Sequence, residues 1–549
     1  MISAKDIRQR FQGLAKVRED YEGLWQDVAD LVAPRRSDLQ DTQLPGKKRG
    51  LKIYDGTPRA ACQQHADGLF GYLCSPSTVW FNLKIARKDV SKIPEVRAYL
   101  QDATIQLHYA FTRSNFYAVT PEYFFDGCSI GTATMYAEED PSTGKVVFTP
   151  RHPREIYIAA NQFGSVDVLF RKFKLTARNA VEKFPTGLSN MIISAARNTP
   201  EAEYEFLHAV YPNTNKQQGK KNNKNMRYTS VYTEFKGTDD ILSHGGYNEF
   251  PYSVWRYRTS SGEVYGRSPA SDALVEILGL NQVTKSVLKA SQLAVEPAYN
   301  VPKEMRGKVR IAPKGMNYYD EDRRMITPIN VPSQLPAGEA QQLRMQKAID
   351  ANFHIDFFTL LSRAALDGRQ LTVPQVVEMQ GEKGAMLGAV VGRLNGDFFD
   401  NTVDRMFQIE TAAGRMPEIP DVLYESGETM IETEYMGILA QAQRQQMRVQ
   451  SITRTMDIIT PLAEINPAVL DRIDFDELVD EVFDANSFPT DAIIPLEEAN
   501  EMRAAQAQQA QQQQDAQMMS EAASKVPAVT GEVADSSVLN QLMGGGEEE

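Results

Sequence analysis

The chain has 549 residues, which is too long for one hydrophobic core and favours two to four structural regions. A hydrophobic content of 42% with 24% charged residues is typical of an ordinary soluble protein, and no apolar run approaches the length of a membrane span. The formal net charge of −13 argues against tight wrapping of nucleic acid, because affinity for a duplex comes mainly from neutralising phosphates, yet it permits a surface past which DNA slides.

The N-terminal region is predicted to be helical. Residues 1–6 lack the pattern of a signal peptide, so we expect synthesis and use in a cytoplasm. Apolar residues from Ile7 to Leu31 recur on one helical face, and Pro34 ends the pattern. After a loop rich in Lys and Arg at 45–50, the pattern predicts helices at 58–73, 94–111 and near Pro121, and a strand at 78–83.

From Gly131 the apolar period changes from helical to alternating, which predicts strands. A turn with hairpin chemistry, Asp140-Pro141-Ser142-Thr143-Gly144, separates two such stretches. The expected strands are 132–137 with 145–148, then 156–158 with 166–173, then 204–211, 228–235 and 252–257, with a helix near 178–184. This region therefore reads as a mixed α/β body of antiparallel pairs, and the whole chain as an α+β protein.

Two long helices follow. The first has Ser268 as its N-cap and Pro269 at its first position, and runs to about Ala294; the second runs from about Glu339 to Leu361. At 1.5 Å per residue each is roughly 35–40 Å long. Each carries one narrow apolar stripe, so the pair needs neighbours from the rest of the chain or from other copies. The stripes are Leu280, Val283, Val287, Ala290 and Ala294, and Met345, Ile349, Phe353, Phe357 and Leu361.

The polar excursion between these helices, residues 296–336, is too short for an independent domain and suits a small docking surface. Its carboxylates at 320–322 raise the alternative of a divalent-metal site for phosphodiester chemistry. They are consecutive and are neutralised by Arg323 and Arg324, so we favour solvated charge. The basic loop at 216–224 is a candidate nucleic-acid contact, but no aromatic residue lies between its lysines. We therefore favour a solvated hairpin loop.

Four glycines recur every four residues in a helix predicted from about Pro374 to Ala413. Each costs a helix about 1 kcal/mol relative to alanine, so the row requires compensation. Either another backbone packs closely along the bare face or the helix is kinked there. The glycines are Gly384, Gly388, Gly392 and Gly396. From about Thr433 the chain is predicted to be helical again.

The sequence lacks the motifs of common enzymes. It has no phosphate-cradling loop, dinucleotide fingerprint, nucleophile elbow or His-Glu-x-x-His pair, so an enzyme is not expected. Cys62, Cys74 and Cys128 have neither metal-ligand spacing nor a disulfide framework, and we interpret them as small buried hydrophobes. No cofactor and no metal are expected.

Four stretches resemble the portal, or head-to-tail connector, proteins of short-tailed phages. Their order and spacing match that family, and the resemblance extends over most of the chain, from about Ile7 to the Gln-rich segment. The stretches are Gly68-Leu69-Phe70 through Trp80-Phe81-Asn82-Leu83, Ser114-Asn115-Phe116-Tyr117, Tyr265-Gly266-Arg267-Ser268, and Pro374-Gln375-Val376-Val377-Glu378.

The resemblance implies a portal-type fold with a mixed α/β wing, a long-helix stem, a small α/β clip and a helical C-terminal crown. Transferred onto this chain, the regions are the N-terminal helices and wing at 1–265, the stem helices at 266–295 and 337–362, the clip at 296–336, the channel loop at 363–372, a long wing helix at 373–430, the crown at 431–524 and a disordered tail at 525–549.

The family's function implies a ring, usually of twelve copies, at one capsid vertex of the virion, assembled in the host cytoplasm. Its implied partners are the terminase large subunit, the head-tail adaptor and tail proteins, the major capsid protein, scaffolding or internal core proteins, and the double-stranded DNA that passes through; no membrane is involved. The alternatives are a metal-dependent nuclease that uses residues 320–322 with the basic loop at Lys220, and another structural protein of the virion.

The resemblance also implies site residues. In the channel loop Arg369 would touch passing phosphates, or would instead pair with Asp367 or with a carboxylate of a neighbouring copy. The implied loop residues are Arg363, Asp367, Gly368, Arg369 and Gln370. The implied docking surface of the clip consists of Lys303, Arg306, Lys308, Arg310, Lys314, Arg323 and Arg324.

Overall fold

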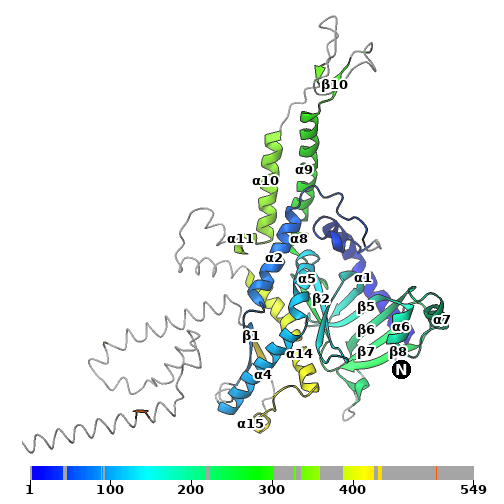
Figure 1. Ribbon diagram of the computed structural model, residues 1–549, viewed down its shortest axis with the longest axis vertical. Helices are drawn as coiled ribbons and strands as arrows, with labels where there is room; N and C mark the ends of the chain where they lie inside the picture. Colours follow the sequence, from blue (N-terminus) through cyan, green and yellow to red (C-terminus); the bar gives the residue numbers. More distant parts are fainter. Residues whose placement is uncertain are drawn as a thin grey trace, which may run out of the picture. The chain divides into compact units, whose positions relative to one another are not determined.

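The computed structural model describes residues 3–40, 46–87, 90, 93–214, 216, 222–301, 303, 327–328, 335–358, 387–425, 431–435, 461 and 502–503. Helices and antiparallel sheets alternate along these residues (Figure 1), so the predicted α+β class is confirmed. The chain divides into two units, residues 1–443 and 444–549, and every element described below belongs to the first.

Helix α1 (Ala4–Leu31) confirms the first predicted helix. It begins after Ser3, whose side chain accepts a hydrogen bond from the backbone N–H of Asp6 over 3.1 Å and so caps the helix. Ile7, Phe11 and Trp25 are buried on the predicted apolar face. The helix ends before the short 3-10 helix η1 (Pro34–Arg36), because proline cannot continue it.

Three further helices lie close to their predicted positions. They are α2 (Thr57–Leu73), α4 (Pro94–Arg113) and α5 (Phe116–Ser129). The predicted strand near 78–83 is displaced by a few residues and is β1 (Phe81–Ile85).

A three-stranded sheet has the order β3-β2-β9 and is antiparallel throughout. Its strands are β2 (Thr132–Glu139), β3 (Val146–Arg151) and β9 (Tyr252–Arg256). The predicted hairpin turn between β2 and β3 is confirmed. In it Asp140 accepts a hydrogen bond from the backbone N–H of Ser142 over 2.9 Å, and Gly144 has a φ of 63°, a conformation that glycine adopts at little cost.

A five-stranded antiparallel meander follows, with the 3-10 helix η2 (Pro153–Glu155) before it and η3 (Asn223–Asn225) between its third and fourth strands. It consists of β4 (Ile156–Ala160), β5 (Val166–Thr176), β6 (Glu203–Pro212), β7 (Tyr228–Glu234) and β8 (Ile241–Tyr247).

Successive side chains of this sheet point to opposite faces, and each face packs against a helical layer. On one face Phe170 and Leu207 pack with the start of α1. On the other, Phe173 and Phe206 pack with α6 (Ala177–Lys183) and α7 (Asn190–Asn198). The patterns of the sequence did not predict α7 or β8.

The end of the long helix predicted at 374–413 completes an aromatic core. Residues 387–394 are α-helical, Asn395–Phe399 form a π-helical turn, and α14 (Asp400–Ala412) continues the chain before α15 (Asp421–Glu425). The π-helical turn places Phe398 with its ring centroid 4.3 Å from that of Tyr123, and Phe399 5.0 Å from that of Trp80. These rings join α4, α5 and β9 to the helix in one cluster.

The chain returns to β1 through β12 (Ile431–Tyr435), which pairs antiparallel with it in the register Phe81↔Tyr435. We expected helix from about Thr433, and that prediction is wrong for residues 433–435. The alternating sequence Ile-Glu-Thr-Glu-Tyr is typical of a strand, and β1 offers it a partner that is 350 residues away in the chain.

The two predicted long helices are present. The first is divided into α8 (Pro269–Asp272) and α9 (Leu274–Val295), and the second consists of α10 (Leu335–Asn352) followed by α11 (Ile355–Phe358). Beyond their tips, β10 (Tyr299–Asn300) pairs antiparallel with β11 (Thr327–Pro328).

Candidate functional site

Helices α9 and α10 lie side by side as a hairpin that extends from the sheets (Figure 1). Two glycines allow the helices to approach closely. A Cβ atom on Gly279 would lie 3.0 Å from Met345 Cε, and one on Gly338 would lie 2.7 Å from Val287 Cγ2. Between these contacts, Gln342 Nε2 donates a hydrogen bond to Thr284 Oγ1 over 2.8 Å. The two helices therefore form one unit whose spacing depends on small residues.

The start of this unit is fixed by a cap that the sequence predicted. Ser268 Oγ accepts a hydrogen bond from the backbone N–H of Ser271 over 3.0 Å, and the N–H of Ser268 donates to Ser271 Oγ over 2.9 Å. Ser268 Oγ also donates to the carbonyl of Ser129, 2.6 Å away at the end of α5. The first turn of the hairpin is thereby attached to the body of the protein.

Polar contacts hold the lower part of the hairpin to the loop before α2. Asn281 accepts a hydrogen bond from the backbone N–H of Tyr54 over 2.8 Å and donates to the carbonyl of Lys52 over 3.0 Å. Gln346 Nε2 donates to Asp55 Oδ2 over 2.9 Å. The apolar periodicity of the sequence gave no signal for these residues, because each acts through its amide or carboxylate group.

Only part of each predicted apolar stripe is buried within the single chain. Leu280 and Ile349 are buried, whereas Val287 is half-buried and Ala294 is exposed. Within one chain, the stripes are therefore covered near the base of the hairpin and progressively less toward its tip.

Further apolar side chains of the hairpin lie outside those stripes and face solvent in the single chain. Val275 is 77% exposed and Val295 is 81% exposed. Leaving a valine in water forgoes about 1.5–3 kcal/mol relative to burying it, so the set favours contact with another surface. Its other members are Leu278, Leu288 and Leu293 on α9 and Leu343 on α10.

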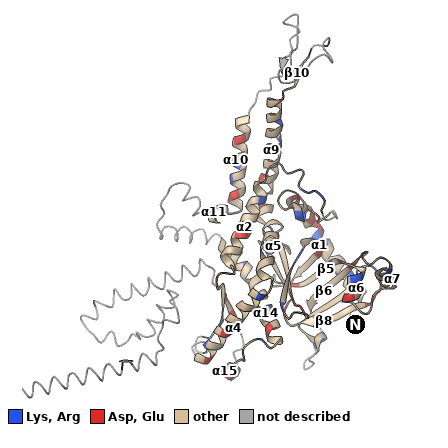
Figure 2. Ribbon diagram, viewed as in Figure 1, with Lys and Arg blue, Asp and Glu red and all other residues tan. Residues whose placement is uncertain are grey.

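The charges on the hairpin are of mixed sign (Figure 2). Helix α9 carries Glu276, Lys285 and Lys289, and α10 carries equal numbers of acidic and basic residues. A mixed surface of this kind does not hold a polyanion tightly.

The second predicted helix was expected to continue to Leu361, but it breaks after Asn352, so that prediction is wrong. His354 has a φ of 52°, in the left-handed region, which interrupts the right-handed helix before α11. The break allows Phe353, Ile355 and Phe357 to be buried together, which their spacing would forbid on one face of a straight helix.

The break packs against α2 through close aromatic contacts. A Cβ atom on Gly68 would lie 2.3 Å from Phe358 Cδ1, so only glycine leaves room for that ring. His65 is fully buried, with its Nε2 3.0 Å from the Tyr257 hydroxyl and its ring 6.2 Å from that of His354. Burial, together with the neighbouring His354, lowers the pKa of His65 to about 3, so it is neutral at physiological pH.

Comparison with protein families decides the relationship of the chain. The family described as bacteriophage head to tail connecting protein matches residues 4–494. The chain belongs to this family of connector proteins.

Two relatives agree with this assignment. The chain is similar to the portal protein of Salmonella phage epsilon15, with 29% identity over 512 residues that cover 90% of each chain. It is similar to the probable portal protein of Bordetella phage BPP-1, with 27% identity over 501 residues that cover 89% of each.

Most residues that the resemblance assigned to a connector site lie outside the described residues. These include all of the channel loop, Arg363, Asp367, Gly368, Arg369 and Gln370, and the clip residues Arg306, Lys308, Arg310, Lys314, Arg323 and Arg324. Lys303 is described and exposed. The carboxylates at 320–322, Lys220 and most of the predicted crown and tail also lie outside the described part of the chain.

Three members of the glycine row lie in the described part of the connector. A Cβ atom on Gly388, Gly392 or Gly396 would meet no described atom within 4 Å, so close packing against the described residues does not explain these glycines. Gly396 belongs to the π-helical turn Asn395–Phe399. Gly384 lies outside the described residues.

Other features of the connector chain concern possible chemistry. Cys62, Cys74 and Cys128 are buried, as predicted, and burial raises the pKa of each thiol. Among the described residues, no group of three or more His, Cys, Asp or Glu side chains is placed to hold a metal ion. Within the same residues, no helix combines the length and apolar character needed to span a bilayer.

Proposed function

We propose that this chain is the subunit of a phage portal, a closed ring at one capsid vertex through which genomic DNA is packaged and ejected. The family match and the names of the two relatives support the proposal. The observation that carries it is the α9–α10 hairpin, whose exposed valines and leucines are not covered by the described residues and favour contact with a partner surface.

In this proposal the hairpin is the stem, and sister copies cover its apolar side chains. The two sheets and their helices form the wing. The β10–β11 pair closes the base of the clip, whose basic residues form a docking surface for the terminase large subunit and the head-tail adaptor. The crown follows the wing in the sequence, and the major capsid protein, scaffolding or internal core proteins and tail proteins complete the virion vertex.

The mixed charge of the stem supports a conduit for double-stranded DNA. A passage that lets DNA slide requires weak and replaceable phosphate contacts, and neither stem helix carries a run of one sign. The motor that drives the DNA would then reside on the terminase.

Electron microscopy of the negatively stained full-length protein tests the assembly. The proposal predicts closed rings with a central hole. Another structural protein of the virion would give filaments, sheets or single particles without that hole. A nuclease would instead cleave DNA in a magnesium-dependent assay of the same preparation.

The proposed channel loop has its own test. If Arg369 lines the bore, Arg369→Glu leaves rings intact but reduces the amount of DNA packaged or retained, because a carboxylate repels the passing phosphates. The DNA content of particles that carry the variant measures this effect. Unchanged DNA content would remove Arg369 from the channel and favour its ion pair with Asp367 or with a neighbouring copy.

A further inference from the structure

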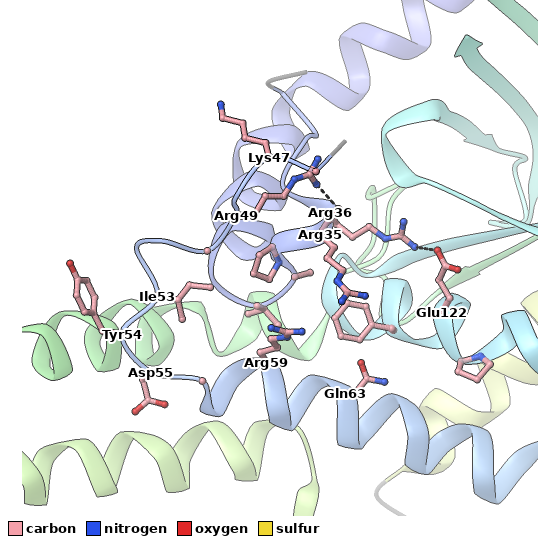
Figure 3. Close-up of a pocket in the computed structure, with 18 residues that line it drawn as sticks. Arg35, Arg36, Lys47, Arg49, Ile53, Tyr54, Asp55, Arg59, Gln63 and Glu122 are labelled. Atoms are coloured by element: carbon pink, nitrogen blue, oxygen red, sulfur yellow. Dashed lines mark hydrogen bonds and ion pairs between the residues drawn. The ribbon is translucent and has the colours of Figure 1, made fainter. Parts of the chain in front are cut away.

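A basic cleft of about 1130 Å³ lies between the end of α1, the loop before α2, α2 itself and α5 (Figure 3). Its described lining includes no residue of α9 or α10. Among the described residues, its charged lining consists of Arg35, Arg36, Lys47, Arg49 and Arg59, with Asp55 and Glu122 of opposite sign. This is a local excess of positive charge in a chain whose net charge is −13.

Two of these cations are held in place by the protein. Arg36 Nε lies 2.8 Å from Asp126 Oδ1, and its Nη2 also contacts Glu122. Arg49 Nη1 donates to the backbone carbonyl of Arg35 over 2.6 Å. These contacts hold the walls of the cleft in place. The charge of Glu122 is balanced by its ion pair with Arg36.

The remaining three cations, Arg35, Lys47 and Arg59, are exposed, and no carboxylate of the described residues pairs with them. Asp55 forms no ion pair with these three cations; its carboxylate accepts hydrogen bonds from the Thr57 backbone N–H over 2.8 Å and from Gln346 over 2.9 Å. Figure 3 shows Arg35 and Arg59 with their guanidinium groups on the same side of the cleft. Arg35 and Arg59 therefore bring two guanidinium groups without a described carboxylate partner to one hollow, and Lys47 lies at its edge with its side chain directed away from them (Figure 3).

The cleft also has apolar walls, which favour an acidic peptide over duplex DNA as its ligand. They are made by Val32, Pro34, Ile53, Pro121 and Phe125. Duplex DNA presents phosphates on a broad convex cylinder and gains little from an apolar hollow. A peptide that carries carboxylates beside apolar side chains uses both parts of the lining, and arginine binds carboxylate through paired hydrogen bonds.

We propose that this cleft binds an acidic segment of a partner protein, in which glutamate or aspartate alternates with apolar residues. The carboxylates pair with Arg35, Lys47 and Arg59, and the apolar residues lie against Ile53 and Phe125. The partner docks on the wing beside the base of the stem, a place distinct from the clip.

Fluorescence anisotropy with the full-length protein in its native assembly tests this proposal. The probe is a fluorescein-labelled twelve-residue peptide of alternating Glu and Leu, and a 20-base-pair duplex is measured in parallel. The test variant is Arg35→Gln with Arg59→Gln. The matched control is Lys48→Gln with Lys52→Gln, which removes the same charge from exposed side chains of the neighbouring loop that do not line the cleft.

The proposal predicts that the peptide binds, that the test variant weakens binding at least tenfold and that the control changes it less than twofold. Arg59→Gln alone, which alters one exposed side chain that has no carboxylate partner among the described residues, is expected to weaken binding about threefold. Absence of peptide binding, or equal loss in both double variants, would overturn the proposal. Binding of the duplex but not the peptide would assign the cleft to phosphate. Loss of assembly in the test variant, without peptide binding to the assembled protein, would assign it to a second copy of this chain.

Discussion

The regions proposed as the wing and the stem bury their apolar side chains in different ways. In the wing, Phe111, Phe116 and Phe398 are fully buried within one chain, and their rings contact each other across three helices. In the stem, Val275 and Val295 remain more than three-quarters exposed although the helices around them are regular. The core of the proposed wing is therefore buried within a single copy, whereas the proposed function has sister subunits cover the exposed side chains of the stem.

This difference separates two kinds of effect that a substitution can have. A change in the wing core alters the free energy of unfolding of each subunit. On the proposed stem, a change at an exposed side chain such as Val275 is expected to alter the association of subunits more than the stability of the single chain, because that side chain is 77% exposed.

The largest expected effect is on assembly. Val275→Asp with Leu278→Asp places two charges on the exposed face of α9, and we expect loss of rings in sedimentation velocity with less than about 0.5 kcal/mol of change in the stability of the subunit. Phe163→Asp is the matched control, because Phe163 is 82% exposed but lies at the β4–β5 turn. Rings that persist in the double variant would show that this face is not an interface.

In the wing core, Phe398→Ala is expected to lower the free energy of unfolding by about 3–5 kcal/mol, because it leaves a cavity among rings that are otherwise in contact. Urea denaturation measures this. Phe163→Ala removes the same atoms from an exposed site and is expected to change stability by less than about 0.5 kcal/mol. A similar loss of unfolding free energy in the two variants would show that Phe398 is not buried in a packed core.

The contact between α2 and the helix break at His354 is expected to be sensitive to acid. The pKa of His65 is about 3 in the folded chain and about 6.5 in the unfolded chain, so only the unfolded chain takes up a proton between these values. His65 therefore contributes a loss of stability as pH falls below about 6.5, amounting to roughly 2 kcal/mol at pH 5. In His65→Gln, the decrease in stability between pH 7 and pH 5 should be smaller by that amount. An identical decrease in both proteins would show that His65 is not buried as a neutral group.

The smallest expected effect concerns the glycine row. Gly392→Ala is expected to stabilise the single subunit by up to about 1 kcal/mol, because no described atom opposes the added methyl group. Gly68→Ala is the control and should destabilise the subunit, since Phe358 occupies that space. Weaker ring formation by Gly392→Ala would indicate close packing between subunits, and normal rings would favour the kink.

The sequence predicted those elements whose signals are local. The cap at Ser268, the hairpin turn at Asp140 and the helical face that includes Trp25 all follow from residues a few positions apart. It did not predict β12, because the partner that makes residues 431–435 a strand lies 350 residues away. It also missed the break at His354, which depends on burial of Phe353, Ile355 and Phe357 against α2.

The candidate site was predicted unevenly for the same reason. The long helices and part of their apolar stripes could be read from periodicity. The basic loop at 45–50 was visible, but its meeting with Arg35 and Arg59 in one cleft depends on the tertiary packing of α1, α2 and α5. The channel loop and clip residues come from the resemblance and stay predictions.

The most direct test of a stem completed by sister subunits is the reactivity of a single added thiol. All three native cysteines are buried, so Val275→Cys introduces an accessible thiol on the stem and Phe163→Cys introduces one on the wing. We predict that in the native assembly maleimide modifies the thiol at position 275 at least a hundredfold more slowly than that at position 163, and that the two rates become equal in urea. Equal rates in the native assembly would contradict the account.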